Sequence, residues 1–165
     1  MSFNTHDSRL KLKTHNYQHR KAVSPEFEIS TDVARLDIDL IHGFLTSSYW
    51  ARGRRRAVVE RAIQNSLCFG VYRGRRQVAF ARVVTDRAVF AYLMDVFVIP
   101  EYRGRGISKT LLQTIRDHPD LQNLRLFLLV TRDAHGLYEK FGFRPLGQPD
   151  QVMEIRDPDS DNRAQ

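Results

Sequence analysis

An almost entirely apolar run over residues 89–99 is followed by a turn with two glycines and then by an amphipathic pattern. The run has the length and the β-branched and aromatic content of a buried strand. From Gly106 onward apolar residues recur at helical spacing, and Pro119 ends the predicted helix. A buried strand, a glycine turn and a helix in this order restrict the chain to folds in which helices pack on a sheet.

The other apolar patterns predict a mixed α and β domain. Upstream, the sequence predicts a short strand at 27–29, helices at 36–45 and 55–65, and strands at 67–72 and 77–84. Downstream, it predicts a strand at 124–130 that is buried on both faces, a helix from 134 to Gly142 capped by Asp133, and a last strand at 152–155. An antiparallel meander followed by strand–helix units predicts a mixed sheet covered by helices.

The length and composition predict one globular domain with its own core. The chain has 165 residues, of which 42% are hydrophobic and 27% charged. Residues 1–24 are interpreted as a flexible basic arm, 25–156 as the domain and 157–165 as a disordered tail. No apolar stretch reaches the roughly 18–20 residues of a membrane span, and no secretory signal is evident, so a cytoplasmic location is expected.

The single cysteine and the histidines give no sign of a metal site. Cys68 lies in an apolar run, which favours a buried structural thiol. The arm holds three irregularly spaced histidines, His6, His15 and His19, without a cysteine companion. Metal sites need several ligands at defined spacing, so no metal is expected.

The turn at residues 103–108 has the chemistry of a phosphate site. Its sequence is Arg103-Gly104-Arg105-Gly106-Ile107-Ser108. Glycines let backbone N–H groups approach a ligand closely, and a helix N-terminus attracts an anion. The net charge of +7 suits an anionic partner, either a phosphorylated cofactor or a nucleic acid. A tight turn with solvated arginines is the structural alternative.

This turn resembles the acetyl-CoA motif of GNAT acyltransferases, whose pattern is Arg/Gln-x-x-Gly-x-Gly/Ala at the start of a helix. Residues 134–143 (AHGLYEKFGF) are similar to a second segment of that family, in the right order and spacing. The chain departs from the pattern at Ser108, where the family has glycine or alanine, and at Thr131, where many members have asparagine. The resemblance covers residues 27–155.

The resemblance implies the GNAT fold, an α/β (α+β mixed) architecture. Its central sheet would be mixed, mostly antiparallel, with about six to seven strands, a splayed parallel pair and about four covering helices. Acetyl-CoA would be the acyl donor, with no metal, and its pantetheine arm would lie in the gap between the strand ending at Val98 and residues 124–130. The residues that this assigns to cofactor binding are Val96, Phe97, Val98, Arg103, Gly104, Arg105, Gly106, Ile107, Ser108 and Thr131.

Tyr138 occupies the position of the family's general acid. A phenol with a pKa of about 10 is suited to protonating a thiolate whose thiol has a pKa of about 8.5. The alternative is a core aromatic beside Leu137 and Phe141. Asp95 is the only charge in residues 89–99, so it is either the base for the acceptor ammonium or a structural partner of a nearby arginine.

The acceptor pocket of GNAT enzymes is shaped by the first two helices and the loop between them. Here Tyr49 and Trp50 are expected to contact the acceptor, and Arg52 or Arg54 to pair with its anionic group. A solvated basic turn with Trp50 buried over the core is the alternative. The arginine cluster disfavours polycationic acceptors and favours an amino-acid-like or otherwise anionic amine.

The resulting hypothesis is transfer of an acetyl group to a primary amine by direct attack in a ternary complex, with a small molecule favoured over a protein as acceptor. The alternative is a non-catalytic acyl-CoA-binding or nucleic-acid-binding module that keeps the fold. Nucleic acid is not expected, because the arginines lack the interleaved aromatic residues of single-strand binders and Tyr138 is retained. No membrane partner is expected, and a homodimer remains open.

Overall fold

A computed structural model describes residues 21–24, 26–157 and 160 of the chain. They contain one six-stranded sheet in the order β1-β2-β3-β4-β5-β6, in which only β5 and β6 pair in parallel. This confirms the predicted mixed, mostly antiparallel sheet with a parallel pair. The strands are β1 Lys21–Ser24, β2 Phe27–Ser30, β3 Leu67–Arg73, β4 Arg76–Thr85, β5 Phe90–Val98 and β6 Leu126–Leu129.

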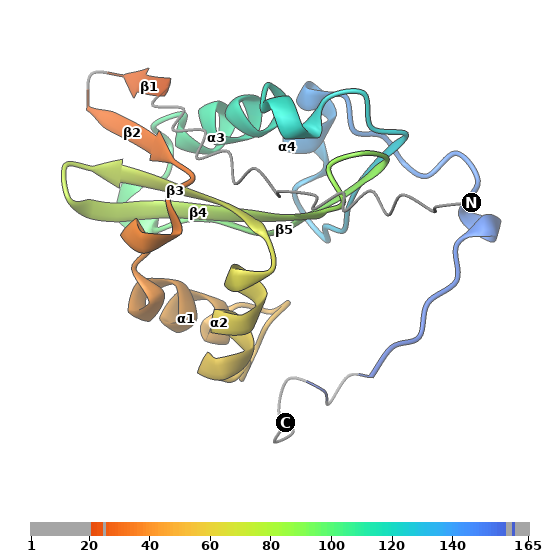
Figure 1. Cartoon of the computed structure of the whole chain (residues 1–165), viewed down its shortest axis with the longest axis horizontal. Coiled ribbons are helices and arrows are strands. Elements are labelled where there is room, and N and C mark those ends of the chain that lie inside the picture. Colours follow the sequence, from red (N-terminus) through yellow and green to blue (C-terminus); the bar gives the residue numbers. More distant parts are fainter. Residues whose placement is uncertain (1–20, 25, 158–159, 161–165) are drawn as a thin grey trace, which may run out of the picture.

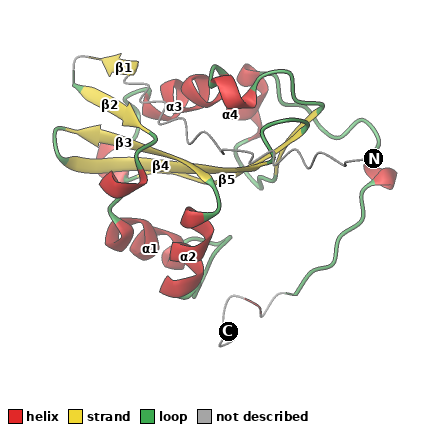
Figure 2. Cartoon of the chain, in the orientation of Figure 1, coloured by secondary structure: helices red, strands yellow, loops and turns green. Residues whose placement is uncertain are grey.

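Helices cover both faces of the sheet (Figure 1). Helices α1 (Ile38–Ser47) and α2 (Arg56–Gln64) lie on one side, and α3 (Ile107–Arg116) and α4 (His135–Tyr138) lie on the other. Asp37 caps α1, because its carboxylate accepts a hydrogen bond from the N–H of Leu40 at 2.9 Å. Short 3₁₀ turns connect several elements. Figure 2 shows the helices, strands and loops of the chain in separate colours.

The core lies between the sheet and these helices. Phe80 on β4 and Phe97 on β5 are buried beneath α1, where Phe97 stacks on Phe44 with ring centroids 4.0 Å apart. The amphipathic pattern of α3 buries its apolar side against the other face, which confirms the helix predicted after the glycine turn. Residues Leu93, Phe97 and Ile99 are buried in this core, so β5 is packed against it up to the point where the candidate site begins.

Strand β5 contains a β-bulge at Asp95. Phe80 pairs with Phe97 and Arg82 with Met94, so a single β4 residue, Ala81, stands opposite two residues of β5. Asp95 adopts a left-handed backbone conformation with φ of 53°. Bulges bend a strand and increase its twist.

The bulge coincides with the end of the parallel pairing. Strands β5 and β6 pair only from Phe90 opposite Leu126 to Leu93 opposite Leu129. Beyond Leu93, β5 continues to Val98 without a partner on its β6 side among the described residues. The predicted splay of the parallel pair is thus present, and the bulge accounts for it.

Two sequence predictions near β6 were wrong in detail. Leu126 is 43% exposed, so β6 is not buried on both faces. Asp133 does not cap α4; instead the Thr131 hydroxyl oxygen accepts a hydrogen bond from the N–H of Ala134 at 3.0 Å. A threonine at this point forms the local turn that leads into the helix.

The ends of the chain also differ from expectation. Residues 21–24, predicted as part of the arm, form β1; residues 1–20 lie outside the described part. The strand predicted at 152–155 is not formed, and these residues follow a 3₁₀ turn at Pro149–Gln151 as an exposed segment. Of the predicted tail, only Asp157 and Ser160 are described.

Candidate functional site

The two motif segments meet at one edge of the sheet because both follow parallel strands. Strand β5 leads through a short 3₁₀ turn into residues 103–106 and α3. Strand β6 leads through Thr131 into α4, which carries Tyr138. Parallel strands present their carboxyl ends at the same edge, and ligands of open α/β sheets bind there. The splay beyond Leu93 opens the sheet at this edge.

The glycine turn is shaped for a ligand at the start of α3. Gly104 and Gly106 have φ of +76° and +77°, a conformation that side chains disfavour. A Cβ atom at either position would meet no atom within 4 Å, so the space above both glycines is open. Gly106 is the N-cap of α3 and no side chain caps it. The first N–H groups of this ten-residue helix therefore point toward an open anion site.

The arginines around the turn have different partners. The Nε of Arg103 donates to the carbonyl oxygen of Val98 at 3.1 Å, so its side chain folds back onto the end of β5. Arg105 lies 5.2 Å from the ring centroid of Tyr102 and 3.9 Å from Glu26. Arg76 lies over the same ring, at 5.6 Å. The surface beside the turn is therefore rich in guanidinium groups gathered around one tyrosine.

Tyr138 is half-buried on α4, with the ring of Phe143 6.0 Å away in an edge-on arrangement. Burial raises the pKa of Tyr138 to about 12, and the nearby Tyr49 and Asp133 act in the same direction. The phenol therefore keeps its proton throughout the neutral range. The arrangement gives Tyr138 the state that a proton donor needs.

The predicted acceptor loop reaches the start of α4. The hydroxyl oxygen of Tyr49 accepts a hydrogen bond from the N–H of Arg132 at 3.4 Å, and the Arg132 guanidinium stacks 3.7 Å from the Tyr49 ring centroid. Trp50 packs edge-on against Tyr49 at 5.0 Å and is 39% exposed. Tyr49 and Trp50 thus lie at the surface near Tyr138, and Trp50 is not the buried lid of the alternative interpretation.

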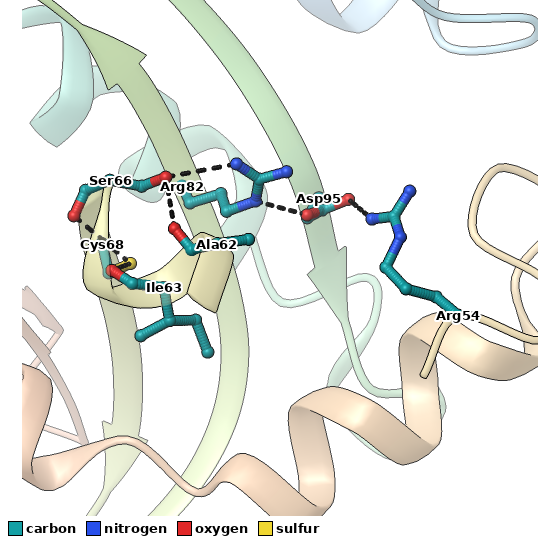
Figure 3. Close-up of polar contacts among 7 residues, drawn as sticks. All are labelled: Arg54, Ala62, Ile63, Ser66, Cys68, Arg82 and Asp95. Atoms are coloured by element: carbon teal, nitrogen blue, oxygen red, sulfur yellow. Dashed lines mark hydrogen bonds and ion pairs between the residues drawn. The ribbon is translucent and has the colours of Figure 1, made fainter. Parts of the chain in front are cut away.

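Asp95 is held by two arginines (Figure 3). Its Oδ2 accepts a hydrogen bond from Arg82 Nε at 2.5 Å, and its Oδ1 accepts one from Arg54 at 3.4 Å. Only 2% of the Asp95 side chain is exposed. Of the two interpretations of Asp95, the structure shows the pairing with arginines.

Arg82 connects the bulge to helix α2 (Figure 3). Its Nη1 donates to the Ser66 hydroxyl at 3.2 Å, and that hydroxyl donates to the carbonyl of Ala62 at 2.7 Å. Arg54 precedes α2 and Ser66 follows it, so both ends of the helix are tied to Asp95. Sequence reasoning missed Arg82, although it is the only charge in residues 77–84, as Asp95 is in residues 89–99.

The arginines of the acceptor loop are not equivalent. Arg54 contacts Asp95 and its side chain is only 13% exposed. Arg56, the first residue of α2, pairs with Asp39 of α1 and with Glu60 of α2, and all three side chains are exposed. Arg52 is exposed. Of the two arginines predicted to bind an acceptor anion, Arg52 is accordingly the one that faces solvent.

No metal cluster accompanies these residues. In the described part of the chain, no group of three or more His, Cys, Asp or Glu side chains is placed to hold a metal ion. None of the described helices is long and apolar enough to cross a membrane.

Comparison with known proteins identifies the family. A model of the acetyltransferase (GNAT) domain matches residues 64–145. A protein of Gibberella zeae named "putative acetyltransferase" is 31% identical, over 70% of this chain and 77% of that protein. The chain belongs to the GNAT acetyltransferase family. Acetyl transfer is the activity of this family, and acetyl-CoA is the donor that it uses.

Solved structures agree with this GNAT assignment. A crystal structure described as a "putative acetyltransferase belonging to the gnat family", from Xanthomonas campestris pv. campestris, is 52% identical to this chain. It matches with a TM-score of 0.81, over 84% of this chain and 99% of its own. A predicted acetyltransferase from Clostridium acetobutylicum, crystallised with acetyl-CoA, shares the fold at 17% identity and a TM-score of 0.57, over 79% and 94% of the two chains.

Proposed function

We propose that this GNAT protein transfers the acetyl group of acetyl-CoA to the primary amine of a small anionic acceptor, with both substrates bound at once. The observation that carries the proposal is the bulge at Asp95, which parts β5 from β6 at the edge where the glycine turn and Tyr138 both lie. The gap, the anion site and the proton donor are the three parts that acyl transfer from a phosphorylated thioester requires.

The residues present fit acetyl-CoA. The open space over Gly104 and Gly106 at the start of α3 would take the pyrophosphate. The edge of β5 at residues 96–98, which β6 does not pair, offers backbone groups to the pantetheine amides, apart from the Val98 carbonyl oxygen that accepts from Arg103. When bound, acetyl-CoA supplies an acetyl group activated as a thioester. Thr131 lies at the end of β6 opposite this edge, where a polar contact is available.

Tyr138 would hold the proton that the departing sulfur needs. The phenol is protonated at neutral pH at its ordinary pKa of 10.0, and burial, which raises that pKa to about 12, does not change this state in the resting protein. Asp95 would act as a positioning residue rather than as the base, because each of its carboxylate oxygens already accepts a hydrogen bond from an arginine. The acceptor would then bind as the free amine or lose its proton to water.

The acceptor would bind beside Tyr49 and Trp50. Arg132 fixes the Tyr49 ring from one side, so the aromatic pair presents a defined surface next to Tyr138. Arg52, exposed in the same loop, would pair with the anionic group of the acceptor. Arg54 pairs with Asp95 and would therefore hold Asp95 in place rather than bind the acceptor.

The decisive experiment measures release of free CoA thiol from acetyl-CoA with a panel of amines. Amino-acid-like and other anionic amines are expected to give acceptor-dependent release, and polyamines much less. Binding of acetyl-CoA without acceptor-dependent release for any amine would contradict the catalytic proposal. Equal or faster reaction with polyamines would contradict the anionic acceptor alone.

Single variants then test the anion contact. Arg52→Ala should raise the acceptor KM about ten- to hundredfold and leave the acetyl-CoA KM unchanged, as expected for loss of a charge-assisted bond of about 1.5–3 kcal/mol. Arg52→Lys should rescue poorly if the contact is bidentate. Arg61→Ala, which removes an exposed arginine from α2, is the matched control and should leave both constants unchanged.

A further inference from the structure

Asp95 adopts a backbone conformation that side chains disfavour, at the point where β5 parts from β6. Its φ of 53° lies in the left-handed region, which only two other described residues with a side chain occupy, Arg87 and Asn123. Those two are exposed and lie outside the strands, whereas Asp95 is buried within β5. The left-handed conformation costs free energy for a residue with a Cβ atom. It persists only where the surroundings hold it.

Arg82 makes the shorter of the two arginine contacts that hold Asp95 (Figure 3). Its Nε donates to Asp95 Oδ2 at 2.5 Å, and the two side chains are 8% and 2% exposed. Arg54 adds a longer contact of 3.4 Å to Oδ1. The Nη1 of Arg82 also donates to the Ser66 hydroxyl, so the guanidinium is anchored independently of Asp95. Arg82 is therefore placed to hold the Asp95 carboxylate, and through it the backbone, in one position.

The backbone groups that β5 presents to the gap beside β6 follow from its pairing with β4. After the bulge, the N–H of Ile99 donates to the carbonyl oxygen of Val78 on β4 at 3.0 Å. Residues of an antiparallel strand alternate between bonding the neighbouring strand and pointing away from it. Val96 and Val98 therefore direct their N–H and carbonyl groups to the β6 side. The bond from Arg103 to the Val98 carbonyl oxygen agrees with this assignment.

The extra residue of the bulge sets this alternation. Before the bulge Met94 stands opposite Arg82, and after it Phe97 stands opposite Phe80. Without the extra residue the first register would continue, and Val96 would come opposite Phe80 instead. The N–H and carbonyl groups of Val96 would then bond to β4 and would not face the gap. The bulge therefore decides which backbone groups are available at this edge of the sheet.

We propose that Arg82 is a positioning residue of the acetyl-CoA site, which acts by holding Asp95 in its left-handed conformation. The proposal rests on the proposed function in one respect, namely that residues 96–98 bind the pantetheine of acetyl-CoA. The guanidinium of Arg82 donates to Asp95 and Ser66. Arg82 thus acts through the bulge rather than by contact with either substrate.

The backbone gives a test that needs no substrate. In residue-resolved hydrogen exchange of the wild type, the amide of Ile99 should be protected and those of Val96 and Val98 should exchange faster. Arg82→Met should remove this alternation. Leu121→Ala removes buried apolar volume far along the chain from the bulge, and as the control for lost stability it should keep the alternation. An unchanged pattern in Arg82→Met, or no alternation in the wild type, would overturn the proposal.

Calorimetric titration with two ligands shows whether the bulge matters for the cofactor. Acetyl-CoA contains phosphates and pantetheine, whereas adenosine 3′,5′-bisphosphate contains phosphates alone. Arg82→Met should weaken acetyl-CoA binding about ten- to hundredfold, as expected for the loss of about two hydrogen bonds, and leave bisphosphate binding nearly unchanged. Weakening of both ligands alike, or of neither, would contradict the proposal. If wild-type protein binds acetyl-CoA but releases CoA with no amine, the proposed function alone fails.

Two double variants decide the case even if Arg82→Met alone does not fold. Each combines Arg82→Met with removal of the carboxylate, by Asp95→Ala in one and by Asp95→Gly in the other, so neither leaves a buried carboxylate without Arg82. Glycine adopts a positive φ without strain, whereas alanine does not. The variant with Asp95→Gly should therefore bind acetyl-CoA about tenfold more tightly than the variant with Asp95→Ala. Equal affinities would mean that Arg82 does not act through the conformation of residue 95, and would overturn the proposal.

Discussion

At the scale of a single residue, the proposed chemistry depends on the hydroxyl group of Tyr138. Tyr138→Phe removes the hydroxyl and keeps the ring that packs against Phe143. If Tyr138 protonates the departing sulfur, kcat should fall about 10²- to 10⁴-fold while acetyl-CoA affinity changes little. Steady-state kinetics with a responding amine measures this. Unchanged turnover would mean that Tyr138 packs against its neighbours and is not the proton donor.

The buried pair of Arg82 and Asp95 predicts a large effect on stability. Arg82→Met keeps much of the side-chain volume but leaves a buried carboxylate with only Arg54 at 3.4 Å. Removing one partner of a buried ion pair costs about 3–5 kcal/mol, because the other charge stays desolvated. Urea unfolding should show this loss. Arg56→Met, which breaks the exposed ion pairs of Arg56 with Asp39 and Glu60, is the control and should have a far smaller effect.

Single residues could be predicted only where a motif or an isolated charge marks them. The glycine turn and Tyr138 stand in motifs, and Asp95 is conspicuous as the only charge in its strand. The sequence could not decide the role of Asp95, since that depends on Arg82 across the sheet and on Arg54 some forty positions earlier. Similarly, the sequence could not show that Arg54 contacts Asp95 whereas Arg52 is exposed, because both depend on the tertiary structure.

At the scale of an element, two variants of Gly106 test whether the N-terminus of α3 is the anion site. Gly106→Ala adds only backbone strain, because φ is +77° and a Cβ would meet nothing within 4 Å. Gly106→Asp adds the same strain and a negative charge where the pyrophosphate would lie. Saturating acetyl-CoA, at about 100 times its Kd, should stabilise the wild type by roughly 2.7 kcal/mol.

The comparison of the two variants separates strain from charge. Gly106→Ala should have a lower melting temperature but keep a rise in Tm with acetyl-CoA, whereas Gly106→Asp should lose that rise. Thermal melting with and without millimolar acetyl-CoA measures both. Equal responses of the two variants would exclude the helix N-terminus as the anion site. No response of the wild type would exclude acetyl-CoA binding.

Helices and strands could be predicted well where the apolar residues have a strong periodicity. They were predicted poorly where a strand forms only through its pairing with a neighbouring strand. The pattern from Gly106 to Pro119 gave α3, and the apolar runs gave β3, β4 and β5. By contrast, β1 lies in a polar basic stretch and is defined by its pairing with β2. Residues 152–155 have a strand pattern, but a strand requires a paired neighbour, and these residues pair with no strand in the described part of the chain.

At the scale of the whole molecule, burial of ionisable groups sets the pH range of stability. Desolvation raises the pKa of Cys68 from its ordinary value of 9.0 to about 12, and those of Tyr72 and Tyr138 from 10.0 to about 12. At a pH between these two values, each group keeps its proton in the folded protein and has released it in the unfolded chain. Below pH 9 both states hold these protons, so the three groups do not then make stability depend on pH.

Between about pH 9 and pH 12 the unfolded chain binds fewer protons than the folded protein, so the free energy of unfolding should fall as pH rises. Urea unfolding at several pH values from 8 to 11 measures the slope. Tyr138→Phe cannot lose a proton in either state and should therefore show a shallower fall above pH 10, with Cys68→Ala shallower from about pH 9. A wild-type profile that stays level across this range, or variants that follow the wild type in parallel, would mean that these side chains are not buried in solution as the fold places them.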